Sequence, residues 1–121
     1  MDTHNERLKR LGDNYDFLHL LQRCHRKQRK ALLKSASKEQ IRLIYECIQN
    51  VLYNKEIFLD PDTKTKLKPK RELLCMLCNP KSCKTWTDRR DVIVQKGGFL
   101  PALLAPVLGI AASLIGDLIT K

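Results

Sequence analysis

The feature that most constrains this chain is the uneven distribution of charge on the two sides of a glycine pair. Residues 1–96 contain 22 of the 23 lysines and arginines and 12 of the 13 acidic residues, so they carry the whole net charge of +10. Residues 97–121 begin with Gly97 and Gly98 and hold only two charged residues. In a chain of 121 residues this division predicts one small basic domain followed by an apolar appendage.

The excess of cations indicates a polyanionic partner, either a nucleic acid or an anionic membrane surface. Solubility alone is the simpler explanation of the same charge. The five cysteines are an odd number, and the start MDTHNERLKR has no apolar signal core. We therefore expect reduced thiols rather than a secreted disulfide scaffold.

The first half of the chain predicts helices. Residues 1–22 indicate short helices broken at the turn-forming sequence Gly-Asp-Asn, and RCHRKQRKALLK, from residue 23, predicts a strongly cationic helix. The next segment, SKEQIRLIYECIQNVLYN, has apolar residues three and four apart. Ser37 and Gln40 have the spacing of a capping box at its start, so this segment predicts a core helix.

The second half of the basic part also predicts short helices. The sequence DPD at residues 60–62 marks a turn or a helix start, and Pro69 should end or kink any helix that begins at Thr63. A further helix is expected over residues 71–78. WTDRRDVIVQ suits a last basic helix, although its VIV would also suit a strand.

These patterns predict an all-α fold. The expected parts are short N-terminal helices (1–22), a small basic multi-helix domain (23–96), a glycine junction (97–98) and a hydrophobic C-terminal helix (99–121).

The apolar tail has 18 uncharged residues, 99–116. A helix over residues 99–119 would be roughly 31 Å long, close to the hydrocarbon thickness of a bilayer. Bulky residues form one stripe and small residues another, and Ala105, Gly109 and Ser113 are spaced to let a second helix approach closely. The tail therefore suits a membrane, self-association or a protein groove, and a buried core helix of the same domain is the alternative.

The chemistry-bearing residues do not form an active site in the sequence. Cys75, Cys78 and Cys83 have part of a zinc-site spacing, but no Cys or His follows them as a fourth ligand. The three histidines lie outside any nucleophile or metal pattern, and no phosphate-binding glycine loop occurs. We expect no metal, no cofactor and no enzymatic activity.

The basic segments supply the residues expected to contact nucleic-acid phosphates. They are Arg23, Arg26, Lys27, Arg29, Lys30, Lys34, Lys64, Lys66, Lys68, Lys70, Arg71, Arg89 and Arg90.

Two stretches carry a resemblance to known proteins. VQKGGFLPALLAPVLG resembles the junction in the adenoviral X (mu) core-protein precursor, where a basic DNA-condensing stretch ends at Gly-Gly before a hydrophobic tail. KQRKALLKSASKEQIRLIYECIQNVL is similar to a small protein of Polinton (Maverick) elements and adintoviruses.

The resemblance implies a virion core protein that binds packaged double-stranded DNA in the virion and the host nucleus. It also implies cleavage by an adenovirus-type cysteine protease at the pattern Gln95-Lys96-Gly97-Gly98, before Phe99. Gln95 departs from the Met, Ile or Leu that such a protease prefers at the first position. The tail would then contact a membrane, a capsid protein or its own copies.

Two other functions compete with this interpretation. One is a membrane-active or tail-anchored protein whose basic half contacts anionic lipids. The other is a small zinc-binding interaction module built on the cysteines.

Overall fold

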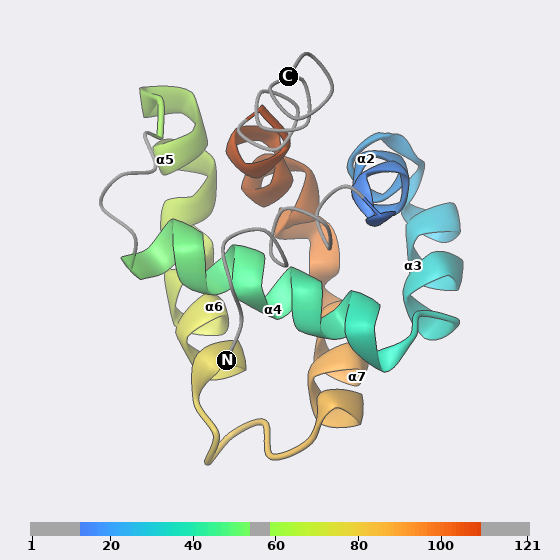
Figure 1. Ribbon diagram of the computed structural model, residues 1–121. Coiled ribbons are helices and arrows are strands. Elements are labelled where there is room, and N and C mark those ends of the chain that lie inside the picture. Colours follow the sequence, from blue (N-terminus) through green and yellow to red (C-terminus); the bar gives the residue numbers. More distant parts are fainter. Residues whose placement is uncertain (1–12, 54–58, 110–121) are drawn as a thin grey trace, which may run out of the picture.

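A computed structural model describes residues 13–53 and 59–109, and every regular element in these ranges is helical, which confirms the predicted all-α fold (Figure 1). The elements are α2 (Tyr15–Arg23), α3 (Arg26–Lys34), α4 (Lys38–Tyr53), α5 (Pro61–Leu67), the short 3₁₀ helix η1 (Lys68–Lys70), α6 (Arg71–Cys78), α7 (Trp86–Lys96) and the 3₁₀ helix η2 (Gly97–Phe99). A helix over residues 100–109, here called the C-terminal helix, follows η2.

The helices gather around α7 and α4. α7, orange in Figure 1, packs against α3 on one side and against α4, which also packs against α6. α7 leads through η2 into the C-terminal helix, drawn in red. The cationic helix α3 and the mostly apolar helix α6 thereby lie on two sides of α7 (Figure 1).

α4 is positioned by the cap and the apolar stripe that its sequence predicts. The Gln40 amide donates to Ser37 Oγ at 3.1 Å, and the Ser37 amide donates to Gln40 Oε1 at 2.9 Å, which is the expected capping box. Ile41, Ile44 and Ile48 are fully buried. They meet leucines and an isoleucine from the neighbouring helices, and the largest fully buried side chains are Leu18, Leu21, Leu33, Ile41, Ile44, Ile48, Leu74, Leu77, Ile93, Leu100, Leu103 and Leu104.

The C-terminal helix belongs to this same core. Leu100, Leu103 and Leu104 are completely buried, and Phe99 and the residues at 107 and 108 are at most 8% exposed. Of the small residues expected to form an association face, Ala105 and Gly109 are exposed, and Ser113 lies outside the described residues. The bulky stripe thus packs inside the protein over its described length.

Continuous helix from Trp86 to Gly109 is long and apolar enough to cross a membrane, by length and composition alone. Its most apolar window is 44% buried inside the protein.

The glycine pair is helical rather than extended. Gly97 and Gly98 lie in η2, which joins α7 to the C-terminal helix, and neither has a positive φ. Gly97 is buried, and a Cβ added there would lie 3.4 Å from Leu100 Cδ1, whereas a Cβ at Gly98 would meet nothing within 4 Å. Only the first glycine is closely packed.

One helix boundary differs from the sequence-based expectation. The cationic helix predicted from residue 23 is interrupted at Cys24 and His25, so Arg23 ends α2 and Arg26 begins α3. The interruption is stabilised because the Arg29 guanidinium donates to two carbonyls at the end of α2, Leu21 O at 3.3 Å and Cys24 O at 3.4 Å.

In the second half the structure agrees with alternatives that the sequence left open. The helix considered from Thr63 begins at Pro61, because the Asp60 carboxylate caps it by accepting the Thr63 amide at 2.7 Å. Pro69 falls in η1, between α5 and α6, where a break was expected. The VIV segment is helical within α7, whose start is fixed by a Thr85–Asp88 capping box.

Candidate nucleic-acid interface

A basic groove of about 980 Å³ lies between α3, α6 and the end of α7. Its cations come from three elements: Arg26, Arg29 and Lys30 from α3, Lys70 from η1, and Lys96 from α7. We call these five side chains and the space between them the basic groove. Residues far apart in the sequence thus meet at one site.

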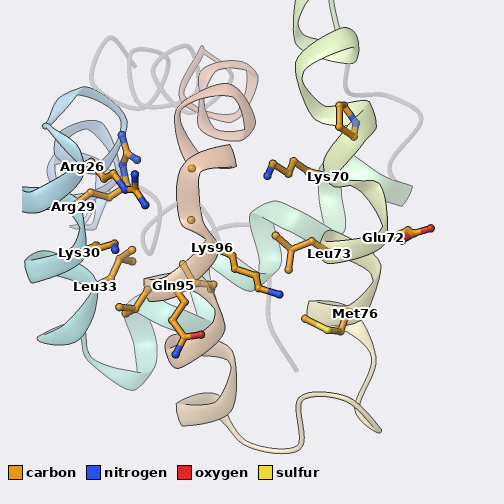
Figure 2. Close-up of a pocket in the computed structure, with 15 residues that line it drawn as sticks. Arg26, Arg29, Lys30, Leu33, Lys70, Glu72, Leu73, Met76, Gln95 and Lys96 are labelled. Carbon is orange, nitrogen blue, oxygen red and sulfur yellow. The ribbon is translucent and has the colours of Figure 1, made fainter.

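The cations line both flanks of α7. Arg26, Arg29 and Lys30 lie on the α3 side, and Lys70 and Lys96 point into the space between α6 and α7 (Figure 2). Glu72 is the acid of the groove lining, and its side chain points away from this space. The groove therefore presents positive charge to the solvent on both sides of α7, with three cations on one side and two on the other.

No carboxylate among the described residues forms an ion pair with any of these five cations. Arg29 is the most restrained of them, because its guanidinium is held by the carbonyls at the end of α2. Several cations that lie close together without counter-charges repel each other, and an anionic ligand relieves that repulsion. The arrangement favours a ligand that carries several negative charges.

The floor of the groove includes the glycine pair. Gly98 is exposed, and no atom would contact a side chain at that position. A residue without a side chain lets the backbone of a ligand come close to the main chain. Leu33 and Ile93, which also line the groove, are buried in the core, so its floor is fixed by packing.

The other predicted phosphate contacts are distributed outside the groove. Arg89 lies in a second hollow, and Arg90 pairs with its neighbour Asp91 at 3.3 Å. The remaining ones are exposed but do not line the groove: Arg23, Lys27, Lys34, Lys64, Lys66, Lys68 and Arg71. Lys96 was expected only as part of the cleavage pattern, because a single lysine beside the glycines gives no sign of a basic cluster in the sequence.

The predicted cleavage site is partly buried: Gly98 is exposed, but the residues on both sides of it are not. Gln95 and Lys96 are exposed, but Gly97 is buried and Phe99 is only 3% exposed. The Gly98–Phe99 peptide bond also lies inside a helical turn. Proteolysis of such a bond requires the segment to open locally first.

The three clustered cysteines do not form a metal-binding group. Within residues 13–53 and 59–109, no three His, Cys, Asp or Glu side chains are placed to share one ion. Cys83 is 1% exposed, and burial, followed by the nearby Cys75, raises the pKa of Cys78. A raised pKa disfavours the thiolate that zinc needs.

Comparison with known proteins found no family model, no curated protein and no solved structure that matches this chain.

Proposed function

We propose that this chain is a non-enzymatic protein that binds double-stranded DNA through the basic groove without reading its sequence. By its resemblance to adenovirus-related elements, we propose the particle core of such an element as its setting, in the virion and the host nucleus. The observation that carries the proposal is the convergence of five cations from three elements, none paired with a described carboxylate.

The groove suits phosphates better than bases. Lysines and arginines that contact phosphates supply affinity and positioning but carry no sequence information. The described lining of the groove has one side-chain amide, that of Gln95, and its five cations can contact the phosphates of any duplex. Binding is therefore expected to depend on salt and to be indifferent to sequence.

The proposed cleavage after Gly98 has a structural consequence. Phe99 and the leucines that follow it are buried, so the cut would require the joint between α7 and the C-terminal helix to open. A protease acting here would then divide the core of the protein, while every residue that lines the basic groove would stay on the N-terminal product.

The test compares two lysines of α3. Lys30 lines the groove, whereas Lys27 is exposed on the same helix outside it. We expect Lys30→Glu to weaken the binding of a fluorescent duplex roughly tenfold and to reduce the salt slope by about 1 or more. Lys27→Glu, with the same change of charge, should alter the affinity by no more than about twofold.

The measurement is fluorescence anisotropy of the full chain with two duplexes of unrelated sequence. If all five groove cations contact phosphates, log K should fall with log salt with a slope of about −4 to −5. Equal losses for the two variants would show that the groove is not the binding site. Binding that is absent at low salt would overturn the DNA-binding proposal altogether.

A second function, membrane association, rests on the length and composition of Trp86–Gly109. To enter a bilayer the helix would have to withdraw Leu100, Leu103 and Leu104 from the core. Flotation of the full chain with vesicles tests this. Flotation with neutral lipid supports insertion, and flotation only with anionic lipid at low salt indicates surface contact by the basic residues.

A further inference from the structure

A second hollow lies at the other end of α7, between its first turn and α4, and has a volume of about 570 Å³. It differs from the basic groove in its floor. Ile41 is fully buried there, and the rings of Tyr45 and Trp86 are half-buried. We call this hollow the aromatic groove. The two half-buried rings offer apolar surface that a ligand side chain can cover.

The rim of the aromatic groove is basic. Lys38 and Lys84 are exposed and form no ion pair with a described carboxylate. Arg42 pairs with Glu46 across one helical turn at 3.5 Å, so the acid in the rim is already engaged. An apolar floor inside a cationic rim complements a ligand that combines carboxylates with an apolar side chain.

Arg89 is the cation of this groove whose position is most closely fixed. Its Nε donates to the Leu77 carbonyl at 3.0 Å, and its guanidinium lies over the Tyr45 ring, 4.1 Å from the centroid. The side chain is half-buried and therefore held in one place, yet no described carboxylate pairs with it. A guanidinium fixed by its Nε keeps its two Nη groups for a bidentate carboxylate.

We propose that the aromatic groove is a docking site for an acidic peptide segment of another protein. One carboxylate of the peptide pairs with Arg89, others lie near Lys38 and Lys84, and an adjacent aromatic or aliphatic side chain covers the exposed part of the Trp86 ring. A peptide fits better than a duplex, because a phosphate backbone has no apolar group for this floor.

The site provides its own reporter, because Trp86 is the only tryptophan in the chain. The probe is an end-capped pentapeptide with one phenylalanine between two pairs of glutamates, titrated into the full chain while tryptophan emission is recorded. A peptide with glutamines in place of the glutamates is the matched control. We expect a saturable change in emission with the acidic peptide and at least about tenfold weaker binding of the glutamine peptide.

Substitutions then locate the site. Arg89→Gln should weaken binding of the acidic peptide about tenfold, and Lys84→Glu about threefold or more. Because Arg89 also contacts Leu77 and Tyr45, Lys84→Glu decides the question if Arg89→Gln does not fold. Lys30→Glu, at the basic groove, should leave peptide binding unchanged and so separates this site from the proposed DNA site.

Three results would overturn the proposal. The first is equal binding of the acidic and glutamine peptides, and the second is no change of emission and no binding at low salt. The third is that a single-stranded oligonucleotide changes Trp86 emission at a lower concentration than the peptide does and displaces the bound peptide. That result would assign the groove to the stacking of bases.

Discussion

α3 and the described part of the C-terminal helix, residues 100–109, hold opposite places in the protein. α3 has the sequence RKQRKALLK and buries only Leu33, while its cations face solvent or the basic groove. The C-terminal helix buries Leu100, Leu103 and Leu104 completely. The change of charge at the glycine pair therefore separates an outer basic surface from part of the inner core. α7, whose last residue Lys96 lines the basic groove, continues through η2 into the C-terminal helix.

From this comparison we expect the largest loss of stability in a chain that ends at Gly98. Such a chain lacks six side chains of the core: Phe99, Leu100, Leu103, Leu104, Val107 and Leu108. Burial of each contributes about 1.5–3 kcal/mol, so together they are comparable to the whole stability of a small domain, about 5–15 kcal/mol. We expect the shortened chain to lose cooperative thermal unfolding by circular dichroism, and an unchanged melting transition would show that the tail is a separate appendage.

The next effect separates two neighbouring residues of the C-terminal helix. Leu104 is fully buried and Ala105 is exposed. Leu104→Ala should lower the free energy of unfolding by about 2–5 kcal/mol, because it leaves a cavity in the core. Ala105→Gln should change it by less than about 0.5 kcal/mol.

Urea unfolding of both variants makes this measurement. Equal, small effects would mean that the helix does not pack as described. A large loss for Ala105→Gln alone would place the opposite face of the helix against the core.

A smaller effect tests whether water reaches the buried thiol of Cys47. Burial raises the pKa of Cys47 from its usual 9.0 to about 12. Above pH 9 the unfolded chain releases this proton while the folded chain keeps it, so this thiol lowers stability as pH rises, by about 1.4 kcal/mol per pH unit up to pH 12. Between pH 9 and 10.5 we expect a loss of about 2 kcal/mol that is missing in Cys47→Ala.

Urea unfolding of the parent and Cys47→Ala at the two pH values measures this difference. The parallel comparison cancels the titration of lysines and tyrosines that the two proteins share. Identical pH dependence in both proteins would show that Cys47 is accessible to water.

Local sequence signals predicted much of the helical framework. The Ser37–Gln40 capping box and the spacing of Ile41, Ile44 and Ile48 identified α4, and the bounds of α6 follow from Pro69 and from the Asn-Pro sequence at residues 79–80. The break before α3 was missed because it depends on Arg29 reaching carbonyls eight and five residues earlier. Such a contact has no sequence signature.

The two grooves could not be predicted from the sequence. Lys70 and Lys96 are brought into one site with α3 only by the packing of α7 between α3 and α6. Similarly, Arg89 meets Tyr45 because α4 packs against α7. The basic runs in the sequence overestimated the number of cations that lie together and omitted Lys96.

Gly98 allows the most direct test of the basic groove as the DNA site, because a side chain there would enter open space without disturbing the core. The measurement is the affinity of the full chain for a short duplex in Gly98→Glu and Gly98→Gln, which differ by one charge and have nearly the same shape. We predict that the glutamate variant binds roughly tenfold more weakly than the glutamine variant, because the two side chains obstruct the groove equally and differ only in charge. Equal affinities in the two variants would contradict DNA binding in this groove.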